Sequence, residues 1–295
     1  MSFEYTNTEK IRVFLASLAG VHLDHIGYAD MATIIVWATV YGIQMLAIFY
    51  MLKNRRYRPI RSHQPYLMLL MYISSVFWFV GDITTNELIH LSSSPLTNCV
   101  FITVWLRSTL GQSLLVGTLV LRSITLYVKY KWNRKLSASM NLAVGGLLMA
   151  SNIVPAIIIT VMPTIKTIKY VPKLQVCDFN PQFKLSVVVL GWVTIGSALG
   201  SGIMLAVFIR CAHKEHRGII AASSILAAAS ALQTAVFYLK PRYAASLAWR
   251  IGIVSTDQVA VLGAWWALMG RSLFNCMFRK QPYLIKWRTE AKIKH

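Results

Sequence analysis

The sequence is poor in acidic residues and in charge altogether. Only 10 of its 295 residues are Asp or Glu, against 30 Lys or Arg, and charged residues make up 14% of the chain. Soluble domains carry about 25% charged residues, so this composition excludes an ordinary soluble protein. The formal net charge of +20 does not indicate nucleic-acid binding. The basic residues lie between long apolar runs, where a membrane protein has its cytoplasmic loops.

Histidine and lysine are missing from the interiors of the long apolar runs. All seven histidines lie at the ends of these runs or between them. A membrane hydrolase of the zinc type needs His and Asp at metal-ligand spacing inside its spans. No lysine lies between Lys240 and Arg271, which argues against a retinal Schiff base in the last run. We therefore expect no metal, no cofactor and no enzymatic activity.

Seven apolar segments make up most of the chain, which is 56% hydrophobic with a mean hydropathy of +0.54. A helix of about 20 apolar residues crosses a bilayer, and each segment reaches that length. We expect an all-α membrane protein with a seven-helix bundle over 31–270, a short extracellular N-terminus over 1–30 and a basic cytoplasmic tail over 271–295. The expected spans are 31–52, 65–84, 99–128, 136–163, 185–210, 218–239 and 247–270.

The distribution of Lys and Arg predicts the orientation of these spans. In or next to the loops after spans one, three and five and in the tail there are 19 of them, against 8 in the N-terminus and the other loops. Basic loops stay in the cytoplasm, so we expect the N-terminus outside and the C-terminus inside. The first 30 residues carry several charges and only the short apolar run Val13–Leu23, so we expect no cleavable signal peptide. That run could form an amphipathic helix on the outer surface or be disordered.

Two of the four cysteines fall on the expected outer side. Cys99 begins span three and Cys177 lies in the loop before span five, and a disulfide persists in an outer, oxidising compartment. We expect these two to be bonded, with two unrelated buried thiols as the alternative. Cys211 and Cys276 fall on the cytoplasmic side and should be reduced.

Span three also carries two arginines, Arg107 and Arg122. On an α-helix both fall on one stripe, which also holds Gly111, Leu114 and Thr118. A guanidinium facing lipid is costly. The stripe should therefore face other spans or water.

Around these residues the sequence resembles a known receptor family. The pattern runs from Cys99 through Trp105, Leu110-Gly111 and Leu114 to Leu126-Tyr127. It is similar to the third helix of the seven-span G-protein-coupled receptor-like proteins of plants and fungi, many of which carry a regulator-of-G-protein-signalling domain. Its wider form is also similar to the glutamate/GABA-type receptors. The resemblance covers roughly residues 30–272.

The resemblance implies a plasma-membrane receptor that passes an extracellular signal, from a small ligand of unknown identity, to a heterotrimeric G protein. Only 25 residues follow Gly270, so the regulator domain and its GTPase-accelerating activity are not carried over. A small-solute transporter is the alternative. Such proteins usually show internal repeats, and spans 1–3 and 5–7 show no convincing one.

Three charged residues lie within the outer halves of the spans. They are Arg107, Asp82 and Asp257, and intramembrane charges of opposite sign are expected to pair. One interpretation is a polar ligand pocket, with walls from Trp105, Gln112, Gln258, Trp78 and Trp249. The other is a structural pair that fixes how the helices align. Arg250, near the outer end of span seven, is expected to snorkel to the surface.

On the cytoplasmic side, Arg122 could hold an inactive-state contact and release it for the G protein. The acid that could pair with it there is Glu215; otherwise Arg122 would snorkel to headgroups beside Lys129. Arg56 and Arg58, in the basic first inner loop, are further candidates for the G-protein side.

Two further patterns concern packing. Span five contains Gly196 and Gly200, a small-residue pair that favours close helix contact within the bundle, with a homodimer as the alternative. After Gly270, the apolar residues Leu273, Phe274, Met277 and Phe278 share one face, which predicts a short amphipathic helix on the inner leaflet.

Overall fold

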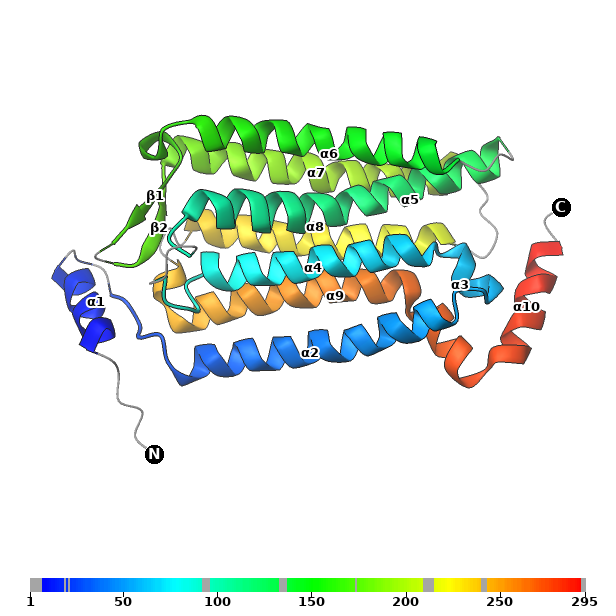
Figure 1. Cartoon of the computed structure of the whole chain (residues 1–295), viewed down its shortest axis with the longest axis horizontal. Coiled ribbons are helices and arrows are strands. Elements are labelled where there is room, and N and C mark those ends of the chain that lie inside the picture. Colours follow the sequence, from blue (N-terminus) through cyan, green and yellow to red (C-terminus); the bar gives the residue numbers. More distant parts are fainter. Residues whose placement is uncertain are drawn as a thin grey trace.

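The structure is a computed structural model that describes residues 7–18, 20, 22–91, 96–132, 137–172, 174–208, 215–239 and 243–292. Seven helices in this part of the chain are long and apolar enough to cross a membrane, and they run along the long axis of the molecule (Figure 1). The protein is therefore an all-α integral membrane protein. Its spans are α2 (Tyr28–Lys53), α4 (Pro65–Thr85), η1 with α5 (Phe101–Ser113 and Leu114–Lys131), α6 (Ala138–Val161), α7 (Pro181–Phe208), α8 (Glu215–Leu239) and α9 (Leu247–Phe278).

Different short elements lie at the two ends of the bundle (Figure 1). One end, which we call the disulfide end, carries α1 (Asn7–Leu18), η2 (Thr164–Lys166), β1 (Ile168–Val171), β2 (Val176–Phe179) and η4 (Tyr243–Ala245). The opposite end, which we call the basic end, carries α3 (Arg58–Ser62) and α10 (Lys280–Lys292). By the distribution of basic residues, the disulfide end is the predicted outer side.

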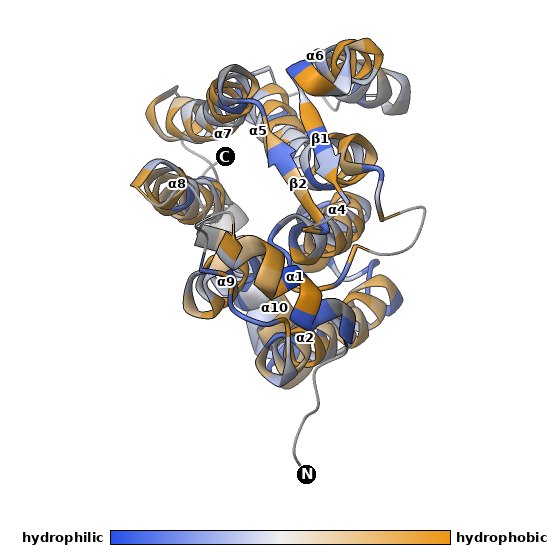
Figure 2. Cartoon of the chain, turned by 90° about the vertical axis from the view of Figure 1, so that its left-hand side faces the viewer, coloured by the Kyte–Doolittle hydropathy of each residue, from blue (hydrophilic) through white to orange (hydrophobic). Residues whose placement is uncertain are grey.

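The exposed faces of the spans are apolar, as lipid contact requires. Leu46, Leu147 and Val207 are 65%, 75% and 69% exposed. Viewed from the disulfide end, apolar residues cover the outward faces of the helices as well as their inner faces (Figure 2). In water such surfaces would aggregate. In a bilayer they contact acyl chains, and the helices satisfy their own backbone hydrogen bonds.

The first six predicted spans agree with the observed helices to within a few residues, and the seventh is longer than predicted. Span seven was expected to end at 270, but α9 continues to Phe278. Leu273 and Cys276 are buried in the bundle core, so this stretch packs against other spans and is not a separate amphipathic helix. A new helix, α10, begins at Lys280 after the chain turns at Arg279.

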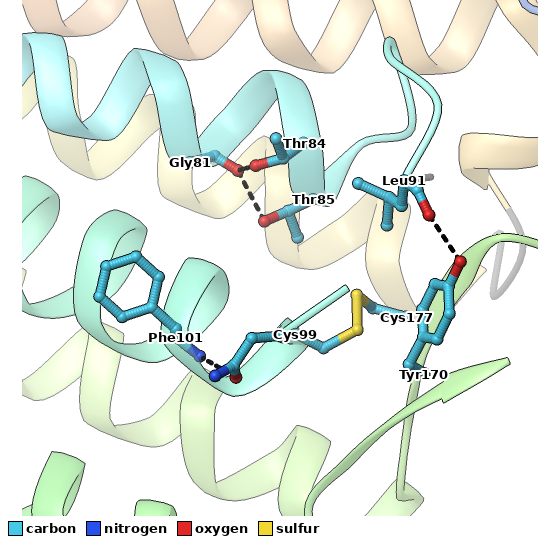
Figure 3. Close-up of a disulfide and its surroundings, with 9 residues drawn as sticks. Gly81, Thr84, Thr85, Leu91, Cys99, Phe101, Tyr170 and Cys177 are labelled. Carbon is cyan, nitrogen blue, oxygen red and sulfur yellow. Dashed lines mark hydrogen bonds between the residues drawn. A yellow bond between two sulfur atoms is a disulfide. The ribbon is translucent and has the colours of Figure 1, made fainter. Parts of the chain in front are cut away.

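The predicted disulfide between Cys99 and Cys177 is present. It joins the start of span three to β2, which pairs with β1 in an antiparallel hairpin with Tyr170 opposite Cys177 (Figure 3). The hydroxyl of Tyr170 also donates to the carbonyl of Leu91, at 2.5 Å. The hairpin is thus fixed to the ends of spans two and three.

Spans two and three make the closest helix contact in the bundle, through one glycine on each helix. A Cβ on Gly81 would lie 2.6 Å from the Cβ of Arg107, and one on Gly111 would lie 2.8 Å from the Cα of Trp78. Only hydrogen fits at these distances. The two glycines therefore let α4 and η1 approach backbone to backbone.

The outer part of span three is a π-helix, η1, whereas the sequence predicted α-helix throughout. The hydroxyl of Thr109 accordingly donates to the carbonyl five residues earlier, that of Val104 (2.8 Å). The predicted α-helical stripe therefore applies only from Leu114 onward. Arg107 and Gly111 still both face span two, because residues four apart also lie close on a π-helix. Long π segments are rare and are often found at functional sites.

Candidate functional site

An ion-paired cluster joins spans two, three and seven near the disulfide end. The guanidinium of Arg107 lies 2.8 Å from the carboxylate of Asp82 and 3.2 Å from that of Asp257. Both aspartates are buried, at 0% and 2% exposure, and the arginine side chain is 17% exposed. The three intramembrane charges identified in the sequence are thus brought together, and Arg107 is the one that reaches the surface of a cavity.

Amide side chains complete the hydrogen bonding of the two carboxylates. Asn86 and Gln258 donate to Asp82, at 2.7 and 3.0 Å. Gln233 on span six donates to Asp257, at 3.2 Å. Two carboxylates share one guanidinium here, so the guanidinium alone cannot compensate both. The three amide N–H donors supply the further hydrogen bonds that a second cation would otherwise provide. A buried charge is tolerated only when it is paired and hydrogen-bonded in this way.

Tyr41 of span one also belongs to this hydrogen-bond network. Its hydroxyl donates to the side-chain oxygen of Gln258 (2.8 Å) and also lies 3.1 Å from the carbonyl of Ser75. Gln258, which was expected as a wall of a pocket, instead bridges Tyr41 and Asp82 and lines neither part of the cavity described below. Spans one, two, three, six and seven all contribute to this one polar network.

A cavity opens from the disulfide end towards Arg107. Its outer part has a volume of about 670 Å³, and a smaller part of about 100 Å³ lies deeper. The two parts adjoin, since both are lined by Thr103, Arg107, Val187 and Phe237. The remaining charged residues that line the outer part are Glu87, Asp178 and Lys184.

Two buried donors line the deeper part without a hydrogen-bond partner in the described residues. They are the indole N–H of Trp78 and the hydroxyl of Thr103. Gln112 also lines this part. Unsatisfied buried donors are uncommon in folded proteins. Together with Arg107 they suit a small polar ligand that offers hydrogen-bond acceptors.

The other predicted walls lie elsewhere. Trp105 donates its indole N–H to Thr160 on span four (2.9 Å) and packs in a cluster beside the disulfide. Trp249 is 42% exposed on the outer surface of span seven. Neither residue lines the described cavities, because depth along a span does not determine which face of the helix a side chain occupies.

The N-terminal helix α1 borders the mouth of the cavity and is attached by a buried arginine. Arg12 contacts the carboxylates of Glu9 and Glu87, at 3.2 and 2.8 Å, and donates to the carbonyl of Leu174 (2.8 Å). Burial raises the pKa of Glu87, and the nearby Arg12 offsets only part of that shift. Ala16, one helical turn after Arg12, lines the cavity. Of the run Val13–Leu23, for which an amphipathic helix was one alternative, only the residues up to Leu18 belong to this helix, and its polar contacts face the bundle.

A second buried ion pair joins spans one and seven, and the sequence interpretation missed it. Arg250, expected to snorkel, is 0% exposed and contacts the carboxylate of Asp30 at 2.7 Å. It also donates to the backbone carbonyls of Asp24 and His25, at 3.1 and 2.7 Å. The chain before span one folds over the end of span seven, and this fold removes Arg250 from both lipid and water.

At the basic end, Arg122 meets a histidine. Its guanidinium contacts Nδ1 of His63, in the loop before span two, and lies 3.2 Å from the sulfur of Met68. Nε2 of His63 lies 2.8 Å from the hydroxyl of Ser272 on span seven. Because arginine only donates, Nδ1 must accept, which assigns the neutral Nε2–H tautomer to His63. The side chain of Glu215, the predicted partner, lies outside the described residues.

Arg56 and Arg58, predicted to face the G protein, are exposed at the basic end. Gly196 and Gly200 are also exposed, and a Cβ on either would meet nothing within 4 Å. The expected packing of this glycine pair inside the bundle is therefore wrong. In span five it is Gly202 that contacts span six, where a Cβ would lie 3.3 Å from Ile220.

Compared with protein-family models and with curated proteins, the sequence gives no match. The geometry of the described residues is therefore the basis for assigning a function.

Proposed function

We propose that this protein is a G-protein-coupled receptor-like membrane protein, located in the plasma membrane, that passes an extracellular signal to a heterotrimeric G protein. The observation that carries the proposal is the role of span three. It supplies an arginine towards each end of the bundle. Arg107 contacts Asp82 of span two and Asp257 of span seven directly. Arg122 contacts His63, just before span two, and His63 in turn contacts Ser272 of span seven.

The ligand would enter from the disulfide end and reach Arg107. Contacts with an acceptor group on the ligand would compete with Asp82 and Asp257 for the guanidinium, because its donors are limited in number. A ligand shifts an equilibrium only through different affinities for two arrangements of the protein. Here the two arrangements would differ in how Arg107 holds spans two and seven against span three.

The G protein would bind at the basic end and would respond there to the change in the positions of the spans. The contacts there among Arg122, His63 and Ser272 join the same three parts of the bundle, and among the described residues they include no carboxylate. A contact between a cation and a neutral group is weaker than a buried ion pair, so it can be released when the spans move. Arg56 and Arg58 beside it would contact the G protein.

The test is nucleotide exchange on purified heterotrimeric G proteins reconstituted with the full chain in lipid vesicles. We expect faster basal exchange than in empty vesicles for at least one Gα class. Arg122→Gln should change that basal rate several-fold, whereas Trp249→Phe, an exposed residue at the far end, should not. A basal rate equal to that of empty vesicles for every Gα class would contradict the proposal.

A small-solute transporter is a second candidate, favoured by the position of Arg107, Asp82 and Asp257 within the spans. Ionisable residues inside a membrane commonly mark substrate or ion pathways. Uptake by vesicles that contain the full chain, measured with a panel of amino acids, sugars and nucleosides, distinguishes the two functions. Uptake that Asp257→Asn abolishes, with no nucleotide exchange, would support the transporter.

A further inference from the structure

Two adjoining cavities lie at the basic end of the bundle, away from the cavity at Arg107. Their volumes are about 460 and 450 Å³. They meet at Arg61, Gln64 and Asn141, which line both. The walls come from the loop between spans one and two and from the basic ends of spans two, three and four.

The cavities are lined by five cations and no acid. Arg55, Arg56 and Arg61 line the first, and Arg58, Arg61 and Lys129 line the second. Among the described residues no carboxylate pairs with any of them, whereas Arg107, Arg12 and Arg250 at the other end are all paired. Five like charges around one space repel one another. An anion that binds between them would remove that repulsion.

Apolar side chains line the parts of the cavities that continue along the spans. Leu67 and Leu121 line the first cavity and Leu126 lines the second. Tyr66, which is 62% exposed, and Trp287 of α10 complete the lining. Aromatic rings of this kind are typical of the level of the lipid headgroups. The two cavities thus combine a cationic part with apolar walls that continue along the spans. This combination suits an amphiphile, with an anionic headgroup and apolar chains, rather than a free ion.

Gln64 adds a specific polar group at the junction of the two cavities. Its backbone is in the left-handed region, with φ 56°. Its side-chain oxygen is buried and has no hydrogen-bond partner in the described residues. A buried acceptor without a donor is costly. A hydroxyl group on the ligand would supply that donor.

We propose that the two cavities form one binding site for an anionic phospholipid whose phosphorylated headgroup also carries hydroxyls, as in the phosphoinositides. The headgroup phosphates lie among the guanidinium groups, which bind phosphate through paired hydrogen bonds. A headgroup hydroxyl donates to Gln64, and the acyl chains run along Leu67 and Leu121 towards the bilayer. Basic pockets between spans on the cytoplasmic side suit such headgroups. The site is argued without the proposed receptor function, and a lipid bound there would share Arg56 and Arg58 with a G protein.

The test uses the purified full chain in phosphatidylcholine nanodiscs, with binding of short-chain phosphatidylinositol bisphosphate measured by native mass spectrometry. We expect it to bind at least about tenfold more tightly than short-chain phosphatidylcholine. Arg61→Gln, which removes the cation shared by both cavities, should weaken binding about fivefold, the contribution of one cation near the membrane surface. The matched control Arg279→Gln removes an exposed arginine at the same end that lines neither cavity, and should weaken it less than about twofold.

Equal losses for Arg61→Gln and Arg279→Gln would overturn the proposal, because they would indicate general surface attraction. Arg58→Gln provides the same test if Arg61→Gln does not fold. Soluble inositol trisphosphate separates the two sources of the headgroup: if it binds as tightly as the lipid, the occupant is a free polyphosphate and the lipid assignment is wrong. Gln64→Asn should weaken the phosphatidylinositol lipid more than phosphatidic acid, which lacks the hydroxyls, and an equal loss for both would overturn the role of Gln64.

Discussion

The two arginines of span three illustrate how the two ends of the bundle differ. Arg107 pairs with two buried carboxylates, whereas Arg122 contacts a histidine and a methionine sulfur. Both are largely enclosed, so the difference between them lies in the partners that the described residues provide. A buried charge facing a carboxylate is held firmly, because removing either group leaves the other uncompensated. A charge facing neutral acceptors can exchange them for others at lower cost.

The same difference holds for the ends as a whole. The ion pairs that the structure describes all lie towards the disulfide end. They join spans two, three and seven to one another, span one to span seven, and α1 to the chain after span two. The cations of the basic end have no carboxylate among the described residues. The charges of the disulfide end are therefore largely compensated within the chain, and the uncompensated cations of the basic end are suited to binding partners outside it.

Removing a buried arginine at each end tests this difference most directly. Arg250→Gln should lower the free energy of unfolding by about 3–5 kcal/mol, because Asp30 would keep an uncompensated buried charge. Arg122→Gln should cost about 1.5–3 kcal/mol, the range for hydrogen bonds to a charged group. Unfolding in detergent, followed by circular dichroism, measures both. Equal costs would mean that the partner carboxylate contributes nothing.

The disulfide gives the next largest effect. Its loop spans 78 residues, and loss of a native disulfide costs about 2–5 kcal/mol. Cys99→Ser, Cys177→Ser and the double variant should lose the same stability, because one bond is lost in each. The melting temperatures of the three purified variants check this. A double variant clearly less stable than both single variants would show that the cysteines contribute separately.

Gly81→Ala should destabilise the contact between spans two and three by about 1–3 kcal/mol, the usual cost of overpacking. The new Cβ would meet the backbone of Arg107 at 2.8 Å, so the helices must separate. Gly252→Ala in span seven is the matched control, since its Cβ would meet nothing within 4 Å. That variant should keep or raise the melting temperature. If Gly81→Ala is as stable as the control, spans two and three are not in backbone contact.

The smallest effect is a pH dependence at the disulfide end. Burial raises the pKa of Glu87 in the folded protein above its ordinary value of 4.5. The folded state then holds the proton more tightly, so Glu87 contributes stability below pH 4.5 that is lost as the pH rises through the folded pKa. Glu87→Gln should remove this slope when melting temperatures are compared from pH 4 upward (about the range over which the carboxyl titrates). An unchanged slope would exclude Glu87 as its source.

The spans could be predicted because each depends on residues within one helix, and the central cluster because opposite charges inside a membrane tend to pair. About twenty apolar residues identify a span, and counting inward from its end places Asp82, Arg107 and Asp257 in the outer halves of their spans. The sequence could not predict the pairing of Arg250 with Asp30, because it depends on how the chain before span one folds back. It could not predict His63 as the partner of Arg122, since a loop residue follows no periodic pattern.

The hydrogen-bond register of span three has a consequence for how this helix can change in length. Loss of one residue from an α-helix such as α5 rotates everything beyond it by about 100°, which would carry Arg122 away from His63. In the π segment between Phe101 and Ser113, loss of one residue can convert a π turn to an α turn. The rest of the helix then keeps its rotation. The outer half of span three can therefore tolerate single-residue deletions that its inner half cannot.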